Sequence, residues 1–249
     1  MDNRDILNIA LEQSAEDLCC RSEDFFCGAP CIVRSRENPK ARRYLVLPFA
    51  CNLVYYGGNI VASVSEEAEP VVRNFLHRFS PEYCYETPAI HVLDEGLRPL
   101  GLRTRHMAEY FLPDVTVVQP FPCAYPLRLL EPKDFSDLYL PQWSNALCEK
   151  RKHLDVLAVG AYDGEKLIGL AGASADCQEM WQIGIDVLPE YRRQGIAAAL
   201  TSRLAIEILE RGKVPFYCAA WSNIPSVRNA IRCGFRPAWV ELTAKPIME

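Results

Sequence analysis

The residues from Arg192 to Ala197, RRQGIA, combine two arginines with a glycine and small side chains, which suits them to binding an anion. Glycine and alanine leave backbone N–H groups uncovered, and the sequence from Ile196 onward has the pattern of a helix, whose N-terminus carries a partial positive charge. A phosphate or pyrophosphate group could therefore bind at this turn. The alternative is that Arg192 and Arg193 are ordinary solvated charges, the commoner state of arginines.

Two other phosphate-binding motifs do not fit this segment. A P-loop ends in Gly-Lys-Ser or Gly-Lys-Thr, and a dinucleotide-binding turn carries three glycines with an acidic residue about 20 positions later. The turn has Gly195 as its single glycine and contains no lysine. The sequence therefore predicts a different kind of anion-binding turn.

A strand and a helix must position this turn. Apolar and other residues alternate from Gln182 to Val187, the period of two expected of a β-strand, and Pro189 ends the pattern. After the turn, an apolar stripe at four-residue spacing from Ile196 to Ile208 predicts a helix that stops at Gly212. The turn therefore joins the end of a strand to the start of a helix.

A second segment strengthens this interpretation: a strand over residues 215–221, then Asn223, then a helix that ends at Gly234 and Phe235. With the turn, this segment resembles the GNAT superfamily of acetyl-CoA-dependent N-acetyltransferases, whose signature is Arg/Gln-x-x-Gly-x-Gly/Ala after a Val-x-Pro strand end. The resemblance covers about residues 127–249. The whole chain resembles a bacterial branch of two-part GNAT proteins with an extra N-terminal half.

The resemblance implies how acetyl-CoA would bind. The main-chain groups expected beside the acetyl group and the pantetheine arm are those of Ile185 and Val187. The residues expected around the pyrophosphate are Arg192, Arg193, Gln194, Gly195, Ile196 and Ala197. The residues expected along the other side of the pantetheine are Asn223, Ser226 and Asn229. Asn223 could also cap the helix, which is compatible with a contact to the cofactor.

Catalytic groups are harder to identify. Acetyl transfer to an amine needs a deprotonated amine, a polarised carbonyl and a proton for the leaving thiolate. In many GNAT enzymes a tyrosine supplies that proton, and the matching position here is Ala230, while the usual base positions are Trp181 and Ile183. Glu179 and Asp176, just before the strand, are the candidate bases, although carboxylates in turns commonly serve the turn and the solvent.

Three further residues have side chains that could transfer a proton, and of these Asp186 is the nearest in sequence to the expected thioester. Strand alternation places Asp186 on the face opposite Ile185. Tyr217 and Cys218, on the following strand, are further candidate acids.

Composition narrows the class of protein. With 249 residues, 49% of them hydrophobic, the chain can bury one large core or two small ones. No apolar run approaches the ~20 residues of a membrane helix, and the acidic N-terminus predicts no export signal. Eleven cysteines at irregular spacings, Cys27 and Cys31 among them, form no metal-ligand pattern, so we expect reduced thiols, no metal and a cytoplasmic protein. A net charge of −5 argues against nucleic-acid binding.

Prolines at positions 120, 122 and 126 predict a boundary between two domains, residues 1–122 and 127–249. In the second, strands are expected at 127–130, 155–162, 166–174, 180–188, 215–221 and 238–243, with one or more helices in 132–152. In the first, we expect a helix at 5–18, a strand at 43–48, a hairpin at 51–56 and 59–64, and helices at 69–79 and 89–100.

The fold class is therefore predicted as α/β (α+β): a GNAT-type mixed, mainly antiparallel central sheet flanked by helices, with an N-terminal α/β domain. That domain has an unknown role and could be a degenerate GNAT-like copy. The leading hypothesis is an N-acetyltransferase that transfers the acetyl group of acetyl-CoA directly to a small primary amine in a ternary complex. The alternatives are a CoA-binding sensor or interaction protein with little or no catalysis, and a peptide or protein N-acetyltransferase. The partner is expected to be the small-molecule amine, with no nucleic acid and no membrane, and the chain could form a homodimer.

Overall fold

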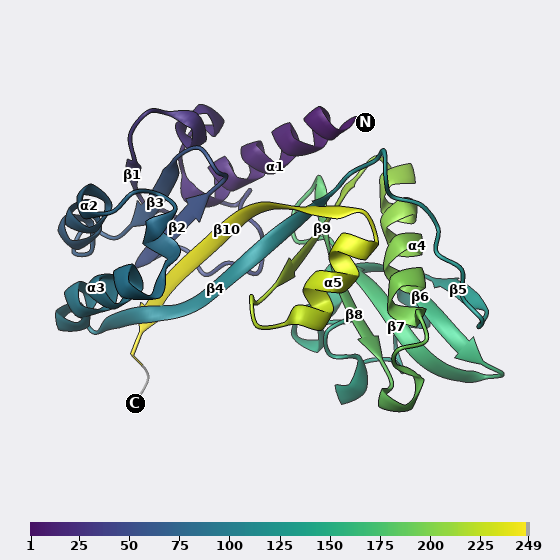
Figure 1. Cartoon of the computed structure of the whole chain (residues 1–249). Coiled ribbons are helices and arrows are strands. Elements are labelled where there is room, and N and C mark those ends of the chain that lie inside the picture. The colour runs from purple at the N-terminus through teal and green to yellow at the C-terminus, as the bar shows by residue number, and fades with distance from the viewer. Residues whose placement is uncertain (248–249) are drawn as a thin grey trace. The chain divides into compact units, whose positions relative to one another are not determined.

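The computed structural model describes residues 1–247, which form two compact units (Figure 1). Unit 1 comprises residues 1–9 and 111–237, and unit 2 comprises residues 10–110 and those from 238 onward. The boundary expected near residues 120–126 lies inside unit 1. The reason is that Val118, Phe121 and Tyr125, around the prolines of this connection, pack against the core of unit 1. The prolines correctly indicated an extended segment. Its apolar side chains place this segment in unit 1 rather than between two domains.

Unit 1 is built on a mainly antiparallel sheet in the order β9-β8-β7-β6-β5 (Figure 1). Its strands are β5 (Leu127–Leu130), β6 (Asp155–Asp163), β7 (Lys166–Ser174), β8 (Met180–Val187) and β9 (Val214–Ala219). Neighbours from β5 to β8 are antiparallel, whereas β8 and β9 are parallel. Its two long helices are α4 (Ile196–Glu210) and α5 (Ile224–Arg232). The strands expected between residues 127 and 221 and the two expected helices are confirmed within one or two residues at most ends. The strand expected at 238–243 exists but runs over residues 235–246, and residues 238–243 belong to unit 2.

The expected helices within residues 132–152 are wrong, because the chain there makes only three short 3-10 turns. Pro132 and Pro141 each open one of these turns. The third is interrupted at Arg151, whose φ of −137° and ψ of 39° are not helical. Helical composition was therefore not enough to form an α-helix in a segment with prolines at 132 and 141.

Helix α4 covers one face of the unit 1 sheet. Its stripe residues Ile196, Leu200, Leu204 and Ile208 are each at most 1% exposed. A Cβ on Gly169 of β7 would stand 3.0 Å from side-chain atoms of both Ile196 and Leu200, so the start of the helix lies directly on the sheet. This packing fixes the N-terminus of α4 beside the end of β8.

Unit 2 contains strands in the order β1-β3-β2-β10-β4 and has its own core. Its elements are β1 (Cys31–Arg34), β2 (Cys51–Tyr55), β3 (Ile60–Val64), α2 (Glu69–Arg78), α3 (Thr87–Leu97), β4 (Leu102–Pro113) and β10 (Phe235–Pro246). The unit boundaries fall inside β4, inside β10 and inside the first helix, α1 (Asn3–Leu18). The expected hairpin is confirmed as β2 and β3, which are antiparallel around Gly57, a residue with φ of +88°.

The strand expected at residues 43–48 is absent from the described chain. Its apolar residues include Val46, which is 79% exposed. A strand needs a neighbour, and the edge of β3 is taken by β1, which pairs with it in parallel from Cys31 to Arg34. Apolar content alone therefore did not make a strand.

A buried ion cluster holds unit 2 together, centred on Arg42. The Arg42 guanidinium pairs with Asp17 through Nε and with Glu241 through Nη2, the latter at 2.6 Å, and all three residues are at most 3% exposed. Glu241 Oε1 also accepts a hydrogen bond from Trp239 Nε1 at 2.8 Å, and Arg42 Nη1 donates to the Tyr44 hydroxyl at 2.6 Å. Each charge thus has partners inside the unit.

No helix in residues 1–247 combines the length and the apolar character needed to cross a bilayer.

Candidate functional site

The edge of β8 that faces β9 is only partly paired. In the described chain these parallel strands pair at three positions, Met180 with Val214, Trp181 with Pro215, and Gln182 with Phe216. Both strands continue beyond this point, β8 to Val187 and β9 to Ala219. The second half of β8 therefore has a backbone edge without a neighbouring strand.

The direction of the backbone groups along that edge follows from the ladder with β7. In an antiparallel pair, alternate residues point both backbone polar groups at the same neighbour. The Leu188 N–H donates to the Ile168 carbonyl at 3.0 Å, just past the end of β7's pairing with β8. By alternation, Ile185 and Val187 point their backbone groups away from β7. A bond on the other edge agrees, because the Glu179 carbonyl, in the same alternation, accepts the N–H of Val214 at 2.8 Å.

The anion-binding turn follows this free edge and has an unusual backbone. Arg193 has φ of +63°, a left-handed conformation uncommon for a residue with a side chain, and Gly195 has φ of +82°. A Cβ on Gly195 would meet no atom within 4 Å, so the space in front of the turn is open. Left-handed backbone at two positions in one turn aims N–H groups outward, and such strain concentrates at ligand sites.

The first turn of α4 adds further N–H donors. The first helical hydrogen bond runs from the Ala199 N–H to the Gly195 carbonyl at 3.1 Å. The N–H groups of Ile196, Ala197 and Ala198 precede it and have no intrahelical acceptor. The first turn of α4 carries no acidic residue, and its partial positive charge is therefore available to an anion.

Side chains of the turn tie it to the strand and to the preceding connection. Arg192 Nε donates to the Val187 carbonyl at 3.1 Å, and Tyr125 donates its hydroxyl to Gln194 Oε1 at 3.1 Å. Arg192, Arg193 and Gln194 are all exposed. The turn is thus held at both ends while its arginines remain open to solvent.

Helix α5 places polar side chains beside the end of β9. Asn223 caps it by accepting the Ser226 N–H at 3.3 Å. The Ser226 hydroxyl is hydrogen-bonded to the hydroxyl of Tyr217 in β9 at 2.8 Å, and Asn229 Nδ2 donates to Thr201 Oγ1 of α4 at 2.9 Å. Asn223, Ser226 and Asn229 therefore lie on α5 beside the end of β9, and their contact with a cofactor stays a prediction.

The opposite face of β8 carries Asp186, as strand alternation predicts. Its carboxylate accepts three hydrogen bonds, from the Asn145 N–H at 2.9 Å, the Asn145 side-chain amide at 2.6 Å and the Ala146 N–H at 3.0 Å. Asp186 is thus an anchor for the loop at residues 144–147. Sequence reasoning missed this loop.

Two strand glycines make room for that loop and were the available signal. A Cβ on Gly184 would stand 1.8 Å from the Asn145 carbonyl oxygen, and one on Gly172 would stand 1.9 Å from that of Ala146. Glycine inside a strand indicates close approach of another backbone. The pair Gly172 and Gly184, which face each other across β7 and β8, therefore marks where the loop lies against the sheet.

The two candidate bases lie at the paired end of β8. Glu179 contacts Lys213 Nζ at 3.2 Å, and Asp176 is fully buried and ion-paired with Arg151 at 2.6 Å. At about 3.3 Å per residue, Glu179 lies roughly 20 Å from Ile185 along the strand. This placement does not favour direct contact with a reacting amine, and the role of either carboxylate stays a prediction. Ala230, where the family's tyrosine is expected, is fully buried.

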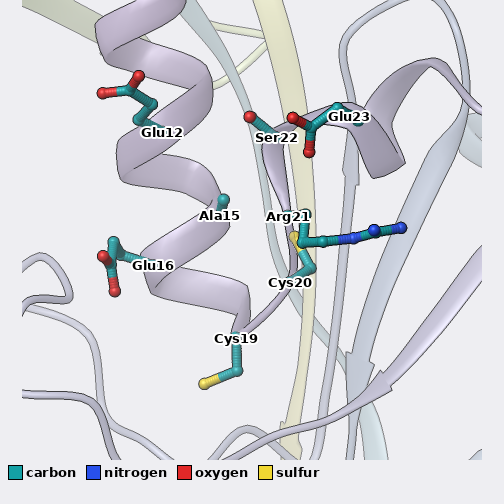
Figure 2. A pocket seen from close by; sticks show the side chains of 8 residues that line it. All are labelled: Glu12, Ala15, Glu16, Cys19, Cys20, Arg21, Ser22 and Glu23. Carbon is teal, nitrogen blue, oxygen red and sulfur yellow. The ribbon is translucent and has the colours of Figure 1, made fainter.

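A surface pocket of unit 2 lies far from these residues in the sequence. It has a volume of about 360 Å³ and is lined by the second half of α1 and the following residues 19–23. Figure 2 shows Glu12 and Glu16 on the helix and Glu23 across from it. In residues 1–247, no group of three or more His, Cys, Asp or Glu side chains could hold a metal ion.

Comparison with known proteins shows which family this chain resembles. The family model of GNAT acetyltransferases matches residues 104–238, whereas no curated protein matches the chain. Among solved structures, a GCN5-related N-acetyltransferase-like protein from Streptococcus suis is 17% identical, with a TM-score of 0.46, over 66% of this chain and 74% of that one. A GCN5-related N-acetyltransferase from Sphaerobacter thermophilus is 14% identical, with a TM-score of 0.43, over 76% and 73%.

An aminoglycoside N-acetyltransferase solved in complex with CoA is 16% identical, with a TM-score of 0.37, over 53% of this chain and 97% of that one. The matched residues 104–238 include β8, the anion-binding turn, α4, β9 and α5. The family model thus spans more than half of the chain together with every element of the candidate site, and the chain belongs to the GNAT acetyltransferase family.

Proposed function

We propose that this protein binds acetyl-CoA and transfers its acetyl group directly to a primary amine of a small molecule. The observation that carries the proposal is the free backbone edge of β8 at Ile185 and Val187, which leads straight into the anion-binding turn and the N-terminus of α4. A strand edge can hydrogen-bond the amides of an extended pantetheine arm. The open turn at Gly195 can receive a pyrophosphate.

The residues present fit such a ligand. The N–H groups of Ile196 to Ala198 and the exposed Arg192 and Arg193 offer donors and positive charge to the pyrophosphate. Asn223, Ser226 and Asn229 are the polar groups proposed for the other side of the pantetheine. The cofactor would supply the thioester that is to be attacked.

The chain's own groups would assist the transfer in two ways. A backbone N–H of Ile185, directed away from β7, would donate to the thioester oxygen as negative charge develops on it. The amine would enter as the free base, because Glu179 and Asp176 are held in ion pairs at the far end of β8. Acetyl transfer then needs no covalent intermediate on the protein.

The first experiment is isothermal titration with acetyl-CoA and CoA, followed by a thiol-release assay against a broad panel of small amines. Micromolar binding with turnover of at least one amine supports the proposal. Absence of binding would contradict it outright.

A second candidate function is a CoA-binding sensor or interaction protein without catalysis. Ala230 favours it, because this position lacks a hydroxyl. Tight binding without thiol release from any amine, and no change in binding for Glu179→Gln, would support this alternative. A panel of peptides with free N-termini or lysines tests transfer to proteins on the same sample.

A further inference from the structure

A group of exposed cationic side chains lies in unit 2, where β4 begins and β10 ends. Arg103 and Arg105 belong to β4 and Lys245 belongs to β10, and the two strands are neighbours in the sheet (Figure 1). The Ile247 N–H donates to the Gly101 carbonyl at 2.8 Å, which brings the end of β10 against the start of β4, as in an antiparallel pair. Two residues further into each strand, Lys245 therefore lies opposite Arg103.

These three cations share one face of the sheet. Leu102 of β4 and Ala244 of β10 belong to the core to which α2 and α3 contribute. By strand alternation, Arg103, Arg105 and Lys245 point to the opposite face, and all three residues are exposed. We refer to these three residues as the cationic row.

The fold does not neutralise the cationic row. Among residues 1–247, none of its three charges takes part in an ion pair, whereas Arg73 on α2 of the same unit pairs with Glu69 at 2.6 Å. Like charges that lie opposite each other on neighbouring strands are destabilising. In a chain with a net charge of −5, this row of cations indicates a surface that meets negative charge on another molecule.

Two exposed apolar side chains lie at one end of the cationic row. Leu100 is 38% exposed and Ile247 is 42% exposed. The hydrogen bond from Ile247 to Gly101, the residue after Leu100, holds this pair at the start of β4. Apolar area beside charged groups is typical of protein–protein interfaces, where an apolar centre is bordered by polar contacts. The surface therefore suits a partner that carries both carboxylates and an apolar side chain.

We propose that the cationic row, together with Leu100 and Ile247, docks an extended acidic segment of a partner protein. Alternate residues of an extended segment are about 6.6 Å apart, which equals the spacing of Arg103 and Arg105 along β4. Carboxylates at alternate positions can therefore each meet one cation, and an arginine can hold a carboxylate by two parallel hydrogen bonds. An apolar residue beyond the last carboxylate would cover Leu100 and Ile247. All of these residues lie in unit 2, so the inference is independent of the proposed acetyl transfer.

The first test titrates the whole protein with two synthetic peptides, followed by fluorescence anisotropy. One peptide has alternating threonine and glutamate with a leucine at each end, and the other has glutamine in place of every glutamate. The acidic peptide should bind about 10-fold more tightly at low salt, and added salt should reduce this difference, because the charges are exposed. Equal affinities for the two peptides would overturn the inference.

The second test asks where the acidic peptide binds. The double variant Arg103→Gln/Arg105→Gln should bind it about 10-fold more weakly than wild type, since two exposed ion pairs are lost. The control, Arg4→Gln/Arg228→Gln, removes two exposed arginines of unit 1 and should keep the wild-type affinity. An equal loss in both variants would mean that only net charge matters, and this result contradicts the proposal.

A short oligothymidylate serves as a competing anion in the same assay. If it binds wild type more tightly than the acidic peptide and loses affinity in Arg103→Gln/Arg105→Gln, the surface binds nucleic acid and the proposal is overturned. Both double variants change exposed positions only, so their melting temperatures should match wild type. Their titrated affinity for acetyl-CoA should also match wild type, which separates this inference from the proposed function.

Discussion

Polar groups are paired within the Arg42 cluster of unit 2 but lack a partner strand along the free edge of β8 in unit 1. In the cluster, every charge is buried and meets a partner from the same unit, with Arg42 between Asp17 and Glu241. Along β8, the backbone groups of Ile185 and Val187 and the first N–H groups of α4 have no partner strand or helical acceptor. Unpaired polar groups are costly unless water or a ligand satisfies them.

Polar groups in this protein therefore fall into two kinds, those that the fold satisfies and those that stay open to a ligand. Asp17, Glu241 and the Tyr44 hydroxyl accept from the Arg42 guanidinium, and Trp239 donates to Glu241, so the cluster has a structural role in folding. Donors that remain open at a turn with left-handed backbone indicate a ligand. Removing the first kind of group should cost stability, and blocking the second kind should cost binding.

The largest effect is expected for Gly195→Glu at the open turn. A carboxylate there would occupy the place of the pyrophosphate and repel it, so CoA affinity should fall by about 1,000-fold or more, about 4 kcal/mol. Isothermal titration measures this. The control is Gly164→Glu, in the β6–β7 turn, where the glycine also has positive φ and open space. Unchanged affinity in a folded Gly195→Glu variant would rule out the turn as the cofactor site.

Arg42→Met tests the other side of the comparison. It leaves two buried carboxylates without their cation, and breaking a buried ion pair in this way costs about 3–5 kcal/mol of unfolding free energy. Urea unfolding, monitored by tryptophan fluorescence, measures this change in unfolding free energy. Arg43→Met, at the exposed neighbouring position, is the control and should change stability little. A fully stable Arg42→Met variant would mean that the cluster does not hold unit 2 together.

Asp155 is a buried carboxylate in unit 1, outside the Arg42 cluster. Burial raises the pKa of Asp155 to about 6, and the hydrogen bond from the Cys148 N–H opposes that shift. The folded state then holds more protons than the unfolded state between pH ~4 and ~6, so stability should fall as pH rises through that window. Asp155→Asn should flatten this dependence in urea titrations. The exposed Asp137→Asn should retain it, and a slope that persists in Asp155→Asn would assign it to another group.

The smallest effect is expected for Arg192→Ala. Its guanidinium is one charge-assisted contact among several backbone donors, so CoA binding should weaken by about 1–2 kcal/mol, roughly 5- to 30-fold. Raising the salt concentration should narrow the difference from wild type, since Arg192 is exposed. Arg128→Ala, in β5, serves as the charge-matched control. A loss as large as that of Gly195→Glu would mean that the Val187 carbonyl contact of Arg192 also shapes the turn.

Sequence reasoning located the strand, the turn and the helix well, whereas the roles of the candidate catalytic groups stay predictions. Alternation from Gln182 to Val187 and the stripe of α4 depend on neighbours within four residues, which the sequence displays directly. The predicted helices in 132–152 and the strand at 43–48 were wrong, because prolines and the lack of a free sheet edge overruled local composition. The positions of Glu179 and Asp176 relative to Ile185 also needed the strand register.

The local backbone follows from the sequence alone: a strand ended by Pro189, a glycine turn at Gly195, an amphipathic helix that ends before Gly212 and, after β9, a second helix capped by Asn223. Which of these groups lie in contact depends on the tertiary structure. The pairing of β8 with β9 stops after Gln182, Asp186 holds a loop 40 residues away, and Tyr217 reaches Ser226. The physical reason is that contacts between distant segments follow from packing of the whole unit, which no local period encodes.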